Sequence, residues 1–224
     1  LTLKSGRCLG VVGESGSGKS TLARAITGLI PVTSGEVIFD GKCISKFSAS
    51  QYRRIYKDLQ MIFQFPRESF NPVRSLGDSI VLNLKNFGFR GNYKNKAISL
   101  LNRCGLDSSF YSKYPGEVSG GECQRAAIAR AIACSPKLLI CDEATSALDM
   151  IVQRKIISLL GELKDELGMA ILFICHDISL VHYMCDDVAV MKDGHIVEKD
   201  VTSRIIHRPQ NEYTKALIEA SDVY

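Results

Sequence analysis

The sequence lacks the features of a membrane-spanning or secreted protein. Its longest uncharged apolar stretches, such as Ala170–Cys175, are far shorter than the roughly 20 residues that a membrane-spanning helix needs. Residues 1–12 have no basic leader, no long apolar run and no cleavage site of the kind that ends a signal peptide. We therefore expect a soluble chain.

Blocks of like charge, low-complexity segments and internal repeats are also missing. The 224 residues carry a net charge of +4 at pH 7, and charges of both signs are interspersed. This balance is too modest to indicate binding to DNA or RNA, so we expect no nucleic-acid partner. The length fits one large domain or two small ones with a substantial hydrophobic core.

Eight cysteines are present, but the spacings that mark a zinc site are not. No two of them form a Cys-x-x-Cys pair, and no histidine lies near them at zinc-finger spacing. Cys141 and Cys175 lie inside apolar runs, where a free cysteine behaves as a small buried hydrophobic residue. We expect reduced thiols in a reducing compartment.

Short apolar runs alternate with segments of helical spacing. The expected strands are Cys8–Val12, Glu36–Phe39, Gln60–Phe63, Leu138–Cys141, Ala170–Cys175, Val188–Met191 and His195–Val197. The expected helices are Lys19–Leu29, Leu76–Phe87, Ala97–Cys104, Gly121–Cys134, Ile151–Leu167, Ile178–Met184 and Tyr213–Ala220. This alternation predicts an α/β fold with a mostly parallel sheet that is covered on both faces.

The strand pattern stops between Pro66 and about Pro115, where helical spacing is broken by several glycines. We interpret this stretch as a helical insertion carried on the α/β core. The expected organisation is a single domain over residues 1–224, with a core at 1–65 and 135–224 and a helical subdomain at 66–134.

A glycine-rich loop follows the first expected strand and precedes a helix. Residues Gly13–Ser20 match the phosphate-loop pattern G-x-x-x-x-G-K-[ST] completely. Backbone amides at the helix start would point at phosphate oxygens, Lys19 would bridge the β- and γ-phosphates, and the Ser20 hydroxyl would bind Mg²⁺. The residues expected to hold ATP here are Gly13, Glu14, Ser15, Gly16, Ser17, Gly18, Lys19, Ser20 and Thr21.

Two carboxylates follow the expected strand Leu138–Cys141. Asp142, at the end of the strand, is a candidate Mg²⁺ ligand, either directly or through water. Glu143 is a candidate catalytic base that takes a proton from an attacking water or orients it. A strand that ends in acids by chance is the alternative, which the complete phosphate loop upstream makes less attractive.

The run Ser119-Gly120-Gly121-Glu122 opens the helix that leads to that strand. Two glycines at a helix N-terminus, with the Ser119 hydroxyl as a donor, form a second candidate anion site. One ATP does not need two such sites from one chain. We therefore expect the second site to face the γ-phosphate held by a partner subunit; the alternative is an ordinary capped helix start.

With these motifs together, the chain resembles the ATPase domain of ABC transporters from about Leu3 to Ala220. The resemblance implies that Gln64 contacts Mg²⁺ or the attacking water, and that His176 contacts the γ-phosphate and holds Glu143 in place. It also implies that the loop Ser146–Asp149 crosses a dimer interface, where Asp149 contributes to nucleotide binding. Asp149 is equally suited to cap the helix that starts near Ile151.

The chain departs from the family pattern at two places. Glu122 replaces a glutamine that the family often has, which adds negative charge near phosphate. Only 12 residues precede the phosphate loop, whereas the family has an upstream antiparallel sheet with an aromatic residue that stacks on adenine. We expect these N-terminal strands to be incomplete and assign no adenine-stacking residue.

Two stretches resemble the ATPases of peptide and nickel importers: Phe70-Asn71-Pro72 and the tail His207–Leu217. Phe65, after Gln64, stands where those proteins commonly have an acidic residue. The resemblance implies an ATP- and Mg²⁺-dependent ATPase on the cytoplasmic face of the membrane, importing oligopeptides, dipeptides or nickel-type metal complexes. Its implied partners are a second ATPase, identical or related, two permease subunits and, indirectly, an external solute-binding protein.

Three other functions stay open. An ABC exporter or lipid-transporter ATPase would share the chemistry but couple to a different membrane protein. A non-transport ABC protein of DNA repair or translation would carry a long coiled coil or a second cassette, and neither is seen in this sequence. A P-loop kinase or another small NTPase would leave Ser119–Glu122 and His176 without a role.

Overall fold

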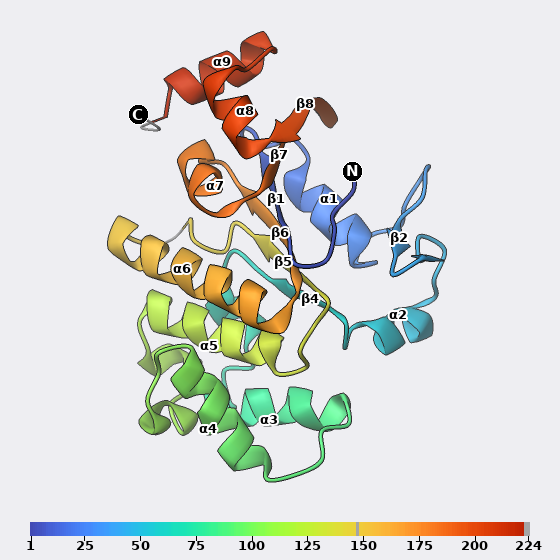
Figure 1. Cartoon of the computed structure of the whole chain (residues 1–224). Helices are drawn as coiled ribbons and strands as arrows, with labels where there is room; N and C mark the ends of the chain where they lie inside the picture. The colour runs from blue at the N-terminus through green and yellow to red at the C-terminus, as the bar shows by residue number, and fades with distance from the viewer. Residues whose placement is uncertain (147, 222–224) are drawn as a thin grey trace.

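A six-stranded sheet forms the centre of the protein (Figure 1). The computed structural model describes residues 1–146 and 148–221. The strands are β1 (Cys8–Val12), β4 (Leu59–Ile62), β5 (Leu138–Asp142), β6 (Ala170–Cys175), β7 (Asp187–Lys192) and β8 (His195–Val201), in the order β4-β5-β6-β1-β7-β8. All neighbours run parallel except β7 and β8, which are antiparallel. The predicted mostly parallel α/β core is confirmed.

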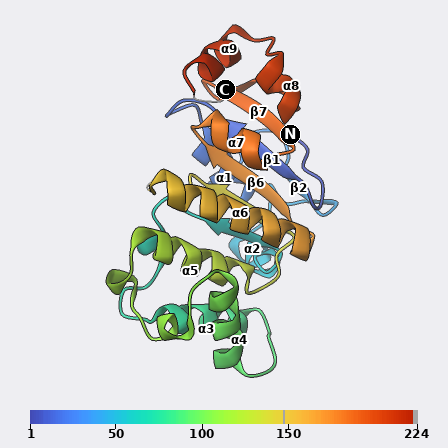
Figure 2. The ribbon, with the colours of Figure 1, turned by 60° about the vertical axis from the view of Figure 1, so that its left-hand side comes forward.

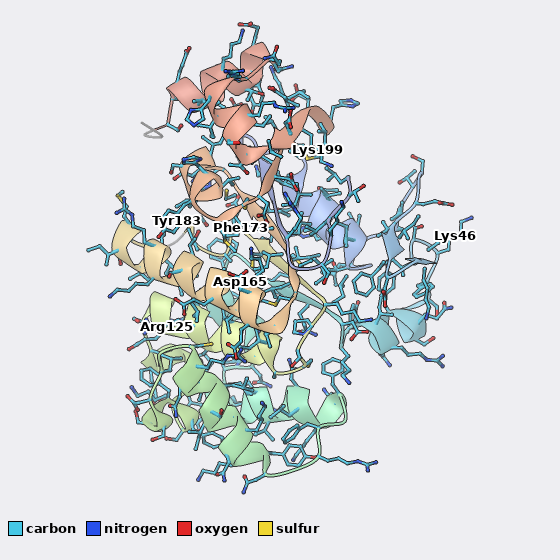
Figure 3. The ribbon with its side chains drawn as sticks, in the orientation of Figure 1. Lys46, Arg125, Asp165, Phe173, Tyr183 and Lys199 are labelled. Atoms are coloured by element: carbon cyan, nitrogen blue, oxygen red, sulfur yellow. The ribbon has the colours of Figure 1, made fainter. Side chains whose placement is uncertain are left out.

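Helices cover both faces of this sheet. Helix α1 (Lys19–Ile26) packs on one face, against a cluster that includes Leu9, Ile140 and Leu172. Residues of the other face, among them the fully buried Phe173 labelled in Figure 3, share one core with several helices. Among these helices are α5 (Gly120–Ile132), α6 (Met150–Leu167), α7 (Ile178–Met184) and α8 (Thr202–His207). Because successive strand residues point to opposite faces, a sheet covered on both needs strands that are apolar throughout.

The register of the strands brings their carboxyl ends to one edge of the sheet. Val12 lies opposite both Cys175 and Val190, and Asp142 lies opposite Ile174. The residues that follow β1, β5 and β6 therefore meet at this edge, which is where open α/β sheets bind their ligands.

A group of helices projects from the β4–β5 side of the core and packs against α5 (Figure 2). It contains α3 (Leu76–Asn86), α4 (Tyr93–Arg103) and the short 3-10 helices η1 (Pro66–Ser69), η2 (Ser108–Tyr111) and η3 (Pro115–Glu117). Ser75 and Asn92 cap α3 and α4, since their side chains accept backbone amides at 3.0 Å. The buried Leu84 and Leu101 join these helices to the same hydrophobic core as the sheet.

The remaining elements are peripheral. A hairpin of β2 (Ile38–Phe39) and β3 (Lys42–Cys43) turns at Asp40-Gly41, where both residues have positive φ, as an Asp-Gly hairpin turn requires. Helices α2 (Ala49–Ile55) and α9 (Glu212–Glu219) lie at the surface, and no helix in the described ranges is long and apolar enough to cross a membrane. Neither α2 nor α8 was predicted. Only Tyr52 is buried in α2, so the sequence of this helix lacks the periodic spacing of apolar residues that predicts a helix.

Candidate nucleotide-binding and catalytic site

The phosphate loop connects β1 to α1, as predicted, and two of its glycines are sterically required. A Cβ on Gly13 would come within 2.1 Å of the Met191 carbonyl oxygen. Gly18, directly before α1, has a φ of 99°, which favours glycine. No side chain caps α1, so its first backbone amides keep their hydrogen-bonding capacity for an anion.

Lys19 is buried beneath this loop. Its ammonium donates to the carbonyl oxygens of Gly13 at 2.7 Å and Glu14 at 2.8 Å, and to the Ser17 hydroxyl at 3.3 Å. Burial lowers the pKa of Lys19, while the negative charge of Glu143 opposes that change. The Lys19 ammonium is therefore held inside the loop by three loop oxygens.

Ser20 and Asp142 meet between the loop and the end of β5. The Ser20 hydroxyl donates to Asp142 Oδ1 at 2.8 Å. Burial raises the pKa of Asp142, and the Ser20 hydrogen bond opposes this rise. Mg²⁺ prefers oxygen ligands and usually takes only one or two carboxylates together with substrate phosphates and water. The Ser20 hydroxyl and the Asp142 carboxylate fit such an ion, because together they offer one hydroxyl oxygen and one carboxylate.

Glu143 sits at the centre of the predicted catalytic group. Its φ of 47° is in the left-handed region, which is uncommon for a residue other than glycine and is often found at functional sites. Its amide donates to the Ile174 carbonyl oxygen at 2.9 Å. Glu143 Oε2 accepts from Gln64 Nε2 at 3.0 Å and lies 4.0 Å from His176 Nδ1. The structure thus brings Gln64, Glu143 and His176 together at the ends of three neighbouring strands.

Residues Ser119–Glu122, the Ser119 turn, form a capping box at the start of α5. Glu122 accepts the Ser119 amide at 2.7 Å, and the Ser119 hydroxyl accepts the Glu122 amide at 3.3 Å. The hydrogen bond from the Ser119 amide to the carboxylate lowers the pKa of Glu122. The departure at Glu122 therefore has a structural role: its carboxylate caps its own helix. The structure confirms a capped helix start at Ser119. The second anion site stays a prediction.

The turn lies against the start of α6. A Cβ on Gly121 would come within 2.7 Å of Val152, so Gly121 permits this close packing. A Cβ on Gly120 would lie 3.5 Å from Leu148, an ordinary contact distance. Asp149 caps α6, accepting the Val152 amide at 3.0 Å, as predicted. Ala147, in the predicted loop Ser146–Asp149, lies outside the described residues.

Two contacts near the site were not predicted from the sequence. Arg67 joins the segment after Gln64 to the Ser119 turn, donating to the carbonyl oxygens of Pro115 at 3.1 Å and Val118. Tyr213, noted only as part of the tail pattern, accepts the Glu14 amide at 3.0 Å through its hydroxyl. No local sequence signal identifies either contact, because both partners are distant in the chain.

Two hollows accompany the site. A groove of about 470 Å³ lies between β4 and the helical subdomain, lined by Gln60, Met61, Phe63, Ser69, Asn71, Arg74, Ser79, Leu82, Asn83, Ala127, Arg130 and Ala131. Phe63 and Leu82 in its lining are 38% and 40% exposed, which is high for large apolar residues. A larger cavity of about 770 Å³ lies on the α1 face of the sheet, but no predicted site residue lines it.

Residues 1–146 match the family model described as ABC transporter. The oligopeptide transport ATP-binding protein OppF of Salmonella typhimurium is 43% identical over 223 residues, covering 98% of this chain and 67% of its own length. OppF of Lactococcus lactis is also 43% identical, covering 98% of this chain and 70% of its own. The glutathione import ATP-binding protein GsiA of Salmonella paratyphi A is 44% identical over 97% of this chain, which is 35% of GsiA.

Solved structures show the same fold. The structure of cbiO1 from Clostridium perfringens, part of the ABC transporter complex cbiONQ, aligns with a TM-score of 0.83 and 28% identity over 93% of this chain and 82% of its own. The ATP-binding cassette MJ0796, as a dimer in a post-hydrolysis state with ADP and Pi, aligns with a TM-score of 0.80 and 30% identity over 90% of this chain and 88% of its own.

Proposed function

Because the chain belongs to the ABC transporter family, as an ATPase with relatives among the peptide importer subunits, we propose that it powers the import of oligopeptides or dipeptides. The relatives named for oligopeptide transport support this cargo through identity over nearly the whole chain. Nickel-type metal complexes are the second candidate cargo, on the resemblance of residues 70–72 and the tail to nickel importers. The proposed location is the cytoplasmic face of the membrane.

The site residues divide the proposed reaction among them. Lys19 and the free amides of α1 hold the β- and γ-phosphates. Ser20 and Asp142, with Gln64 as the third expected ligand, would hold Mg²⁺, which would neutralise phosphate charge. Glu143 takes the proton of the attacking water, and His176 keeps the glutamate oriented toward it. Gln64 donates to the same carboxylate, so a change at the nucleotide is passed to the segment after β4.

The observation that carries this proposal is the position of the Ser119 turn. It begins α5, whereas the phosphate loop begins α1 on the opposite face of the sheet. Among the described residues no hydrogen bond joins the turn to the phosphate loop. A second ATPase subunit, placed head to tail, would bring its own Ser119 turn to the γ-phosphate held here. The MJ0796 cassette, which was solved as a dimer, supports an assembly of two subunits.

The permease subunits would dock in the groove between β4 and the helical subdomain. The groove begins directly before Gln64, has the exposed Phe63 and Leu82 in its lining, and includes the basic Arg74. An amphipathic permease segment could bury these apolar side chains. ATP-driven closure of the dimer would move the groove, and hydrolysis would reset it, a shift between two arrangements that ATP binds unequally.

Light scattering on the Glu143→Gln protein, with and without Mg-ATP, tests the two-site sandwich. We expect the molar mass to double with Mg-ATP, since nucleotide binds but is not consumed. The Lys19→Ala, Glu143→Gln double variant is the control and should stay monomeric. A Glu143→Gln chain that binds ATP and remains a monomer would contradict a homodimer and favour a related ATPase as the partner.

Disruption of the gene in its own cell tests the cargo. We expect loss of growth when an oligopeptide is the source of an essential amino acid, restored by the wild-type gene and not by its Glu143→Gln form. Loss of nickel uptake with normal peptide-dependent growth would favour metal complexes instead. Intact uptake of both, with accumulation of a cellular compound, would favour an exporter, the alternative that shares this site.

A further inference from the structure

The phosphate loop is held from outside by the C-terminal part of the chain, at a residue with no assigned role. Tyr213 is the second residue of α9, nearly 200 positions away from the loop in sequence. Its hydroxyl accepts the backbone amide of Glu14 at 3.0 Å. Glu14 also accepts Lys19 Nζ on its carbonyl oxygen, at 2.8 Å. One loop residue therefore connects Tyr213 to the lysine at the nucleotide site.

Tyr213 is itself fixed in place by several contacts. The ammonium of Lys192, at the end of β7, lies 4.8 Å from the centroid of the tyrosine ring. Asn211 caps α9 by accepting the Tyr213 amide at 2.9 Å. Glu198 of β8 accepts the amides of Gln210 at 2.8 Å and Asn211 at 3.1 Å. A tyrosine that is held at both its ring and its backbone can orient a hydrogen-bond partner, because it has little conformational entropy left to lose.

The ionised carboxylate of Glu198 is suited to hold the start of α9 in place. Burial raises its pKa, but hydrogen bonds, including those from the amides of Gln210 and Asn211, outweigh burial and bring the pKa below its ordinary value. The buried Thr214 and Ile218 anchor the same helix on its inner side. Helix α9 is thus a fixed support rather than a frayed end.

The loop is supported on a second side by the β7–β8 turn. The Gly194 amide donates to the Ser17 carbonyl oxygen at 3.0 Å, and Gly13 packs closely against the carbonyl of Met191. Amides that bind phosphate act best when they are already oriented, because no free energy is then spent on ordering them. The Glu14 amide, facing Tyr213, is the point at which α9 can set that orientation.

We propose that Tyr213 is a positioning residue for the phosphate loop, which orders the loop for ATP by holding the Glu14 amide from outside the site. This inference rests on the proposed ATP site in its functional consequence, but its structural part does not. In this role Tyr213 acts through Glu14, whose amide its hydroxyl accepts, rather than on the reacting atoms. The expected signature is weaker ATP binding with little change in the rate of the chemical step.

The test compares Tyr213→Phe with Tyr93→Phe. Tyr93, on α4 in the helical subdomain, is a matched control because its hydroxyl also makes one hydrogen bond, to the Phe89 carbonyl oxygen at 3.1 Å. It also has a lysine near its ring, since Lys85 Nζ lies 5.6 Å from the centroid. Each variant removes one hydroxyl and keeps the ring, so general effects on stability should be similar.

Two measurements are made on the chain and both variants. The first is hydrogen exchange of the Glu14 amide without nucleotide, which we expect to be faster in Tyr213→Phe alone. The second is Mg-ATP hydrolysis, where KM should rise roughly three- to tenfold in Tyr213→Phe, the loss typical of one neutral hydrogen bond. Its kcat should stay within about twofold of wild type, as expected when an interaction common to ground and transition states is removed.

Unchanged exchange at Glu14 in Tyr213→Phe would overturn the proposal, whatever the kinetics. Unchanged KM, or an equal rise of KM in Tyr93→Phe, would overturn the positioning role. The exchange measurement needs no ATP, so it decides the structural part even if the wild-type chain hydrolyses none. Failure of the ATPase function and failure of this inference are therefore separate results.

Discussion

At the scale of single residues, the site contains residues in conformations or surroundings that are unusual for their type. Glu143 adopts a φ of 47°, which costs a non-glycine residue free energy, and it does so where its carboxylate meets Gln64. Lys19 is buried although lysine is rarely buried. Asp142 is buried at the end of an otherwise apolar strand. These costs are offset by the rest of the fold, and the three residues belong to the proposed reaction.

Glu143→Gln should strongly reduce hydrolysis and preserve ATP binding. The amide keeps the shape and the contact with Gln64 but cannot accept a proton, so we expect kcat to fall by roughly 100- to 10,000-fold, the usual contribution of a general base. Phosphate release and equilibrium binding of a fluorescent ATP analogue measure the two effects. Robust turnover in this variant would contradict the assignment of Glu143.

Lys19→Ala should weaken nucleotide binding itself. The ammonium makes charge-assisted contacts to phosphate in the proposed complex, so its loss should raise the Kd of ATP by about 10- to 100-fold. Titration calorimetry measures it, and Lys155→Ala, a change at an exposed residue of α6, is the control. An ATP affinity equal to wild type would argue against the role of the phosphate loop.

At the scale of elements, much of the fold could be read from sequence. The strands Cys8–Val12 and Ala170–Cys175 were predicted with the bounds that the structure gives them, since an apolar run between clear breaks marks a buried strand. Helix α2 could not be predicted, because it is short and buries only Tyr52. The contact of Tyr213 with Glu14 could not be predicted either, because it depends on how α9 folds back on the core.

Ser119→Arg should block ATP-driven association and leave binding to a single subunit nearly intact. The serine starts α5 at an exposed turn, and a long cationic side chain there would occupy the space proposed for the partner's nucleotide. Ser119→Ala is the control: it loses the cap, at a cost of about 1 kcal/mol in the free energy of unfolding, but leaves the space open.

Analytical ultracentrifugation in the Glu143→Gln background measures the association of both Ser119 variants. Dimerisation of Ser119→Arg at wild-type ATP concentrations would contradict the second anion site. Loss of ATP binding by its monomer would point to misfolding or to a site within one chain.

At the scale of the whole molecule, one hydrophobic core runs from the sheet into the helical subdomain. The predicted boundary at residues 66–134 stays a prediction, but helix α5 belongs to both parts: it packs on β4 as well as on α3 and α4. A movement of the helical subdomain therefore takes the Ser119 turn and the groove with it. Through this connection, a structural change at the nucleotide site would be transmitted to a membrane partner.

Leu82→Asp should uncouple the ATPase from its permease without harming the nucleotide site. Leu82 lines the proposed docking groove and is 40% exposed, so a carboxylate there should cost the isolated chain little stability. In the complex with the permease the same carboxylate would be buried without a counter-charge. Val201→Asp is the matched control, because Val201 is also 40% exposed and lies at the end of β8, away from the groove.

We expect Leu82→Asp to lose co-purification with the membrane fraction and peptide-dependent growth, while its ATP affinity and thermal unfolding midpoint stay at wild-type values. Val201→Asp should keep all four properties. Membrane association of Leu82→Asp equal to wild type would move the permease contact elsewhere on the molecule. Loss of ATP binding in Leu82→Asp would instead show that the groove and the nucleotide site are too tightly linked to be separated by one side chain.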